Sequence, residues 1–177
     1  MQGMTPAPAG TGAAVTSAAG NASHPLTTTA PDRPRSLLSG VLVGVGIAGF
    51  VDETVFHQLL HWHHFYDRST PEAGLVSDGL FHTFSWVAVV AGLFLFADLR
   101  RRDSWVRPRW LGGLLIGLGG FQLYDGTVQH KLLQLHQIRY GVDITPYDIV
   151  WNVVALALVV AGVAVLARSR TPSAQRP

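Results

Sequence analysis

Residues 37–60 read LLSGVLVGVGIAGFVDETVFHQLL, and this stretch decides the fold. Residues 37–51 carry no charge, whereas Asp52, Glu53 and His57 follow near the end of the stretch. A helix of this length, at about 1.5 Å per residue, is long enough to cross a hydrocarbon core of about 30 Å. The stretch therefore predicts a membrane-spanning helix with polar groups near one end.

Three more apolar segments follow at residues 79–97, 110–133 and 149–167. Charged residues make up 14% of the chain, against roughly 25% in an average soluble domain. The apolar runs leave no polar outer face, which a soluble helical bundle requires. We therefore expect an all-α, integral membrane four-helix bundle at residues 36–168, with its first span at 37–60. A disordered tail at residues 1–35 and a short tail at 169–177 would flank the bundle.

The composition also excludes several classes of protein. The chain has no cysteine, so it forms no disulfide and has no thiolate ligand or cysteine nucleophile. Its net charge of +2 is too small to indicate nucleic-acid binding. The expected surroundings are a lipid bilayer instead.

The basic residues predict the orientation of the spans. Ten of the 13 Lys and Arg residues lie before the first span, between the second and third, or after the fourth. Basic residues are enriched in cytoplasmic loops. We therefore expect a multi-pass protein of the bacterial inner membrane with both termini in the cytoplasm.

The first and third apolar segments resemble each other at an offset of 73 residues. Over residues 37–63, 12 of 27 positions are identical to residues 110–136, and the shared residues include Asp52, His57 and His63 with Asp125, His130 and His136. The second and fourth segments match more weakly at an offset of 70. The pattern predicts two parallel helical-hairpin repeats related by an axis along the membrane normal.

Paired glycines occur one helical turn apart in both copies, Gly40 with Gly44 and Gly113 with Gly117. Small residues at this spacing let helix backbones approach closely in lipid. We expect the first and third helices to pack through these four glycines, although such a glycine pair could also drive formation of a homodimer.

The histidines carry the strongest chemical signal. Seven of the eight map to the outer ends of the spans or to the outer loops, namely His57, His61, His63, His64, His82, His130 and His136. In a continuous helix, His57, His61 and His64 would share one face, and Asp52 and His63 another. Together with Asp52 and Asp125, these histidines are the candidate metal ligands, and Glu53, Thr54, Thr127 and Asn152 are candidates to orient them.

Imidazole and carboxylate ligands suit Zn, Cu or Fe, and paired histidines can also ligate haem. Spacing alone does not separate a mononuclear site, a dinuclear site and haem. The sequence contains no H-E-x-x-H motif and no recognisable nucleophile motif, so it assigns no catalytic residue.

Several motifs resemble those of the DUF2243 family of uncharacterised bacterial membrane proteins. They are Gly49-Phe50-Val51-Asp52, the run from His57 to His64, Gly79-Leu80-Phe81-His82, and His130-x-Leu132-Leu133-x-x-His136. Where similar proteins often carry paired histidines, this chain has His136-Gln137. The resemblance implies a multi-span fold and no particular activity. The resemblance also suggests, through the gene neighbourhoods associated with that family, a link to respiratory-oxidase assembly.

Three functions therefore remain open. The leading hypothesis is a transition-metal or haem site near the outer membrane face. The alternatives are a small proton-coupled transporter or channel that uses the buried acids, and a non-catalytic assembly partner of a respiratory complex.

Overall fold

The computed structural model describes residue 3 and residues 30–169, and every regular element in these residues is helical. The helices are α1 (Arg33–Asp52), η1 (Glu53–Leu59), α2 (Pro71–Arg101), α3 (Arg107–Tyr124), η2 (Asp125–Leu132) and α4 (Thr145–Arg168). The predicted all-α fold with four main helices is confirmed. The tails expected at residues 1–35 and 169–177 lie mostly outside the described residues.

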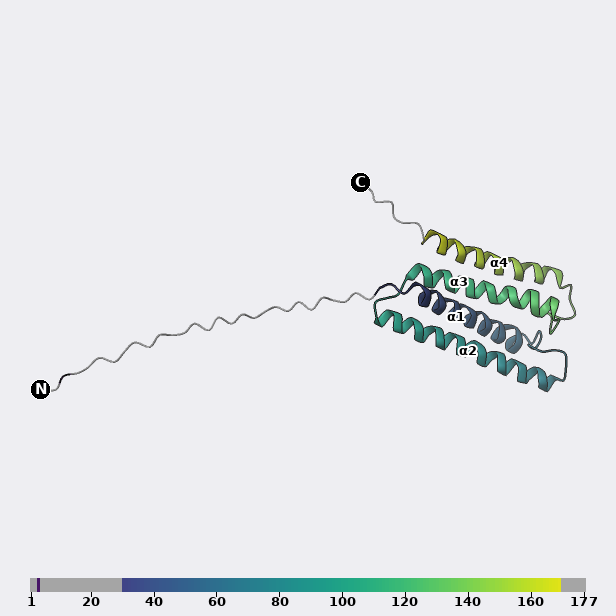
Figure 1. Ribbon diagram of the computed structural model, residues 1–177. Helices are drawn as coiled ribbons and strands as arrows, with labels where there is room; N and C mark the ends of the chain where they lie inside the picture. The colour runs from purple at the N-terminus through teal and green to yellow at the C-terminus, as the bar shows by residue number, and fades with distance from the viewer. Residues whose placement is uncertain (1–2, 4–29, 170–177) are drawn as a thin grey trace.

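The four long helices lie side by side in the order α2, α1, α3, α4 (Figure 1). Within the described residues, α1 contacts α2 and α3, α3 also contacts α4, and the outer helices do not touch each other. The order places α1 and α3 at the centre, so the segments that follow them, η1 and η2, meet at one end of the bundle.

All four predicted spans begin later than the helices in the structure, as the second and fourth illustrate. The second was expected from residue 79, but α2 begins at Pro71, where the Thr70 hydroxyl caps the helix by accepting a hydrogen bond from the Ala73 backbone. Proline suits the first turn because its missing N–H has no helical partner there. The fourth was expected from residue 149, but α4 begins at Thr145, whose N–H donates to Asp143.

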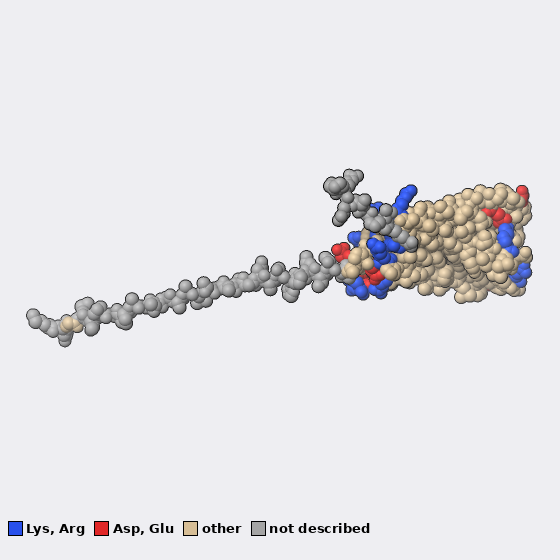
Figure 2. Space-filling view, turned by 45° about the horizontal axis from the view of Figure 1, so that its top comes forward, with Lys and Arg blue, Asp and Glu red and all other residues tan. Residues whose placement is uncertain are grey.

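Three helices in the described chain are long and apolar enough to cross a membrane. They are Arg33–Leu59, Pro71–Arg101 and Thr145–Arg168, with mean hydropathies of 1.6, 1.9 and 2.7. The helix α3, expected to be part of the third span at residues 110–133, is not among them. It has 18 residues, and its first turn contains Arg107 and Arg109. The following segment η2 carries Asp125 and Lys131. Figure 2 shows the charged residues gathered at the two ends of the helical body, separated by an uncharged band.

The apolar and polar residues are distributed as in a membrane protein. Large apolar side chains face outward along the outer helices, such as Phe94 on α2 and Val150 on α4, whereas acids and histidines are buried at the end where η1 and η2 meet. An apolar exterior is stable in lipid but not in water. The structure thus agrees with a protein that sits in a bilayer.

Close backbone contact joins α1 and α3 through the four predicted glycines. A Cβ atom added to Gly40 would lie 2.1 Å from the Trp110 carbonyl oxygen, and one added to Gly113 would lie 2.4 Å from that of Leu37. The contacts are reciprocal, because Trp110 stands 73 residues after Leu37 just as Gly113 stands 73 after Gly40. Gly44 and Gly117 repeat the arrangement, with a Cβ meeting the carbonyls of Leu114 and Val41.

Candidate metal centre

The polar cluster forms where α1 and α3 change from α to π geometry. Both helices continue directly into π segments, η1 and η2, which end at Leu59 and Leu132. After each, the chain turns through a residue with positive φ, His61 at 50° and Gln134 at 51°. These residues are also 73 apart. Segments with π geometry are often found at functional sites, and here they lead into the turns that carry His63 and His136 back into the bundle.

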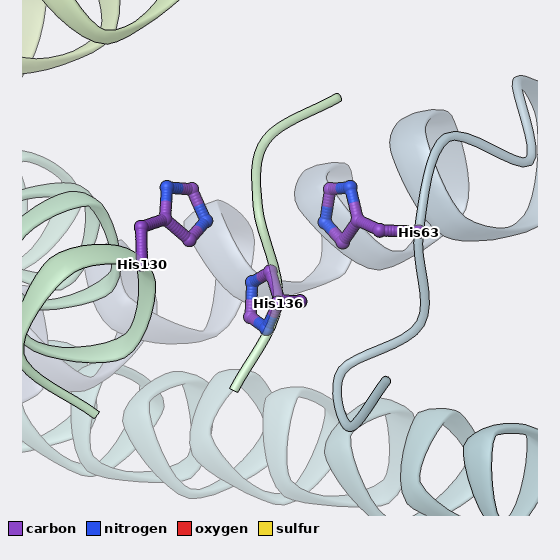
Figure 3. A group of neighbouring side chains, drawn as sticks. All are labelled: His63, His130 and His136. Carbon is purple, nitrogen blue, oxygen red and sulfur yellow. The ribbon is translucent and has the colours of Figure 1, made fainter. Parts of the chain in front are cut away.

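Four histidine rings pack against one another in a row. His63 and His136 stack face to face at the centre, with centroids 4.6 Å apart and planes inclined by 6°. His57 meets His63 edge-on at 4.4 Å, and His130 meets His136 edge-on at 4.6 Å. Each of the four is at most 6% exposed. Figure 3 shows His63, His130 and His136 turned toward a common space, with His130 on the helical segment and the other two on the turns.

Three of the four rings are fixed through their Nδ1 atoms. The Nδ1–H of His63 donates to the carbonyl of Ile138 at 3.0 Å, and that of His136 donates to the carbonyl of Phe65 at 2.9 Å. Each histidine is thus held by the turn that carries the other. His57 Nδ1 donates to Asp78 Oδ1 on α2 at 3.0 Å. Hydrogen bonds at one ring nitrogen commonly orient a histidine whose other nitrogen binds a metal.

The other nitrogen of each ring has no hydrogen-bond partner. The Nε2 atoms of His57, His63, His130 and His136 are all buried without a hydrogen bond, although Asp125 lies close to those of His130 and His136. Buried polar atoms are satisfied in the large majority of cases, and leaving one without a partner costs about 1–3 kcal/mol. Four such atoms in one cluster make the space between the rings one that could hold a ligand.

Two carboxylates of the cluster lie beside these nitrogens. Asp125 Oδ2 is 3.0 Å from His130 Nε2, and its Oδ1 is 3.5 Å from His136 Nε2. Asp52 groups with His57 and His63, each offering one ligand atom within 4.8 Å of the others. His63, His130 and His136 form a second group by the same measure. These donor sets, imidazole with carboxylate, are the ones that Zn and Fe favour.

The two halves of the cluster differ in the acids behind them. His57 Nδ1 lies 2.9 Å from Glu53 Oε2 as well as next to Asp78, and Glu53 is held by Gln58. At the position equivalent to Glu53, the second half has Gly126, where a Cβ atom would meet the side chains of Trp151 and Asn152. The Nδ1 atom of His130 is buried and has no hydrogen-bond partner.

The turn histidine His63 is uncharged at neutral pH. Burial, followed by the neighbouring imidazoles of His57, His136 and His130, lowers its pKa to about 2. With Nδ1–H donating to Ile138, the lone pair of this neutral ring is on Nε2. That is the tautomer that a metal ligand requires.

The remaining predicted residues lie outside the row of rings. His61 is exposed on the turn, and His64 Nδ1 donates to Asp78 Oδ2 at 2.6 Å. His82 on α2 packs against the ring of Phe50 on α1, with centroids 5.5 Å apart. Thr127 is exposed and its hydroxyl donates to the Leu123 carbonyl, while Thr54 is half-buried. Asn152 donates to the carbonyl of Asp148.

The prediction that histidines after Leu59 share a helical face with His57 or Asp52 is wrong. His61, His63 and His64 follow the end of η1, so they share no helical face with Asp52 or His57. Asp52 and His63 nevertheless meet, because the turn folds back over the end of α1. The role of Asp78, which accepts hydrogen bonds from both His57 and His64, was not predicted. The available signal was its match to Asp148 at the offset of 70 residues.

Three cavities border the cluster. One of about 420 Å³ opens at the polar end and is lined by residues that include His61, His63 and Asp67. Two grooves, of about 680 and 530 Å³, open among exposed apolar residues on the sides of the bundle. Seven lining residues of the smaller groove have counterparts in the larger at an offset of 73 or 70, for example Tyr124 with Val51 and Phe81 with Trp151. Phe81 and Trp151 in turn lie 5.8 and 6.2 Å from the rings of His57 and His130.

The fold and the buried cluster define an all-helical membrane protein with a histidine–carboxylate centre at one end. The chain belongs to the family described as "Predicted membrane protein (DUF2243)", whose model matches residues 39–169. The resemblance noted in the sequence is therefore confirmed. Neither a curated protein nor a solved structure matches the chain.

Proposed function

We propose that this protein is a metal-dependent membrane protein with a transition-metal centre near the outer face. The ligands in this proposal are His57, His63, His130 and His136 with Asp52 and Asp125. The observation that carries it is the set of four buried Nε2 atoms without partners, gathered beside two buried carboxylates.

A purely structural role for the cluster leaves these atoms unexplained. At His57 and His63, a neutral imidazole leaves the buried Nε2 lone pair without a donor, and a protonated one leaves its N–H without an acceptor, so either state costs free energy. The Nε2 atoms of His130 and His136 have only the carboxylate of Asp125 nearby, at 3.0 and 3.5 Å. A metal ion accepts the lone pairs and offsets the carboxylate charge, so it resolves both problems together.

The packing of the rings supports a metal ion over haem. His63 and His136 are stacked face to face with 4.6 Å between centroids. Axial haem ligands approach the iron from opposite sides of the macrocycle, so their nitrogens point at each other across it. A face-to-face stack leaves no slot for a macrocycle between the two rings. Among ions, Zn, Fe and Cu suit this donor set.

When bound, such an ion supplies Lewis-acid or redox chemistry. The residues of the chain hold and orient it. The carbonyls of Ile138 and Phe65 fix two rings from opposite turns, Asp78 fixes a third, and the apolar side chains of the helices keep bulk water away.

A channel along the central seam is less well supported. The backbones of α1 and α3 touch at all four glycines, where even a Cβ atom would clash. This contact closes the space between α1 and α3 in the part of the bundle between the cluster and the Arg-rich end. The buried acids therefore do not line a continuous pore along α1 and α3.

The side grooves favour a second candidate function, the binding of a lipid-soluble quinone or quinol. In the larger groove the walls include Phe56, Trp62 and Trp151, and Gln122 supplies an amide oxygen that is buried without a partner. Aromatic walls suit a planar ring, and the free amide oxygen would accept a quinol hydroxyl. Saturable quenching of tryptophan fluorescence by a short-chain ubiquinone tests this function. Loss of quenching in a Val150→Phe, Val154→Phe variant would support it, and an unsaturable signal would argue against it.

We further propose that all four helices cross the membrane and that both termini are cytoplasmic. The polarity of α3 is explained by its position, because it lies between α1 and α4 and is partly shielded from lipid. Arg33, Arg35 and the arginines between α2 and α3 lie together at the end away from the cluster. The positive-inside rule then places the cluster on the outer side of a bacterial inner membrane.

Metal analysis of the purified full chain tests the proposed centre. We expect Zn, Fe or Cu bound after purification or reconstitution, with no Soret band in the optical spectrum. A double variant, His63→Gln with His136→Gln, should lose the metal, whereas His82→Gln should keep it. Wild-type protein that retains no metal after reconstitution would overturn the proposal.

A further inference from the structure

We infer that the centre holds two metal ions, one in each half of the cluster, and that the two sites differ in affinity. The first would be bound by Asp52, His57 and His63, and the second by Asp125, His130 and His136. This inference rests on the proposed metal centre and adds the number of ions and their order of binding.

The ligands divide naturally into two equal sets. Each set is one aspartate, one histidine from a π segment and one histidine from the following turn. Within the second set, the two oxygens of Asp125 face the two histidines separately, at 3.0 Å from His130 and 3.5 Å from His136. Asp52 has the same relation in sequence to His57 and His63, and these three are within ligand reach of one another.

A single ion would leave part of the cluster unsatisfied. The ring row is nearly symmetric, with edge contacts of 4.4 and 4.6 Å and longer cross contacts of 6.1 Å for His57–His136 and 6.2 Å for His63–His130. The group of His63, His130 and His136 includes neither His57 nor Asp52, which belong with His63 to a different group. Two ions use the Nε2 atom of every ring in the row.

The buried charge also calls for two ions. Asp52, Glu53, Asp78 and Asp125 are each at most 2% exposed. Among the described residues, the ion-pair partners of these acids are all histidines, with no Lys or Arg among them. No fixed cation of the described chain therefore lies beside these four acids, and each bound ion would supply positive charge to one half of the cluster.

The difference between the halves sets the order of binding. Two carboxylates, Glu53 and Asp78, face Nδ1 of His57, whereas the corresponding nitrogen of His130 has no partner. Partners of this kind typically change metal affinity 10- to 100-fold. The site of Asp52, His57 and His63 should therefore fill first, and the two dissociation constants should differ by about 10–100-fold.

Titration of the metal-free full chain with Co²⁺ and Zn²⁺ tests the inference. The visible absorption of bound Co²⁺ should rise to two equivalents per chain in two steps. His57→Asn and Asp52→Asn should each remove the tighter step, and His130→Asn and Asp125→Asn the weaker one. The control variants His61→Asn and His82→Asn should keep both steps.

The outcomes separate the inference from the proposal beneath it. One equivalent per chain, lost equally in the His57 and His130 variants, would overturn the two-ion inference and leave the metal centre intact. No binding by wild type would overturn both. If a histidine variant fails to elute as a monodisperse peak, the stoichiometry of the wild-type titration still decides between one ion and two.

Discussion

At the scale of single residues, the centre depends on hydrogen bonds that cross between the two turns. His63 donates to a carbonyl 75 residues later in the chain, and His136 to one 71 residues earlier. Because each turn orients the histidine of the other, neither ring can be placed correctly until both turns have folded. The free nitrogens that result belong to the assembled bundle and to neither hairpin alone.

Asp78→Asn should weaken metal binding in the first half of the centre by about 10–100-fold. The carboxylate accepts from His57 and His64 and from the Phe65 backbone, so the substitution removes the anion that orients His57. Competition with a chromophoric chelator measures the effect.

The matched control is Asp148→Asn, at the equivalent position of α4. Asp148 pairs with Lys131 and not with a histidine of the row. Its variant should bind metal as wild type does. Equal losses in the two variants would contradict the orienting role of Asp78.

At the scale of elements, the seam between α1 and α3 sets the geometry on which the centre depends. Position 113 requires glycine because an added Cβ atom would lie 2.4 Å from the Leu37 carbonyl oxygen. On the same helix, Gly120 has nothing within 4 Å of that position. The same substitution can therefore be compared at Gly113 and at Gly120.

Gly113→Ala should destabilise the protein by about 1–3 kcal/mol, because the helices must separate to admit the methyl group. Gly120→Ala should be neutral or slightly stabilising, since alanine favours the helical state. Thermal unfolding in detergent, followed by the loss of the monodisperse peak, measures both. A Gly113→Ala protein as stable as Gly120→Ala would show that the seam tolerates separation.

The sequence predicted the helices better than it predicted their ends. Apolar length located the four helices, and the offset of 73 pointed to the glycines and the histidines that the structure brings together. The π segments could not be foreseen, because residues 53–59 have the same composition that an α-helical end would have. His63 was therefore placed on a helical face with Asp52, when it actually reaches Asp52 from a turn. Asp78 escaped notice because its partners are brought to it only by packing of α2 against η1.

At the scale of the whole molecule, charge separates the two ends of the bundle. The end away from the cluster carries the arginines that flank α2 and α3, and the band between is apolar (Figure 2). A long band without charge makes insertion favourable, and the imbalance between ends makes one orientation preferred.

Cysteine labelling of the intact cell should report this orientation. The natural sequence has no cysteine, so a single introduced thiol gives a clean signal. Ser69→Cys, on the turn beside the centre, should react with a membrane-impermeant maleimide in spheroplasts. Arg101→Cys, at the opposite end, should react only after permeabilisation. The reverse pattern would invert the proposed topology.

Metal removal should lower the thermal stability of the whole bundle. A ligand present at 100 times its dissociation constant stabilises the folded state by about 2.7 kcal/mol, and chelation removes that contribution. It also leaves Asp52 and Asp125 as buried charges without cations. Melting in detergent with and without chelator measures the change. An Asp52→Asn, Asp125→Asn variant should show no dependence on chelator.

The reciprocal contacts at the glycine seam have an evolutionary consequence. A contact in which the same residues serve both sides is the geometry of a symmetric homodimer. Fusion of two such hairpin protomers would produce the present chain, so an ancestor of half its length would have shared its metal ligands across a subunit boundary. In that ancestor, a single position would have corresponded to both Glu53 and Gly126. On this proposal, the two halves would become free to diverge, as Glu53 and Gly126 do, only once a single gene encoded both.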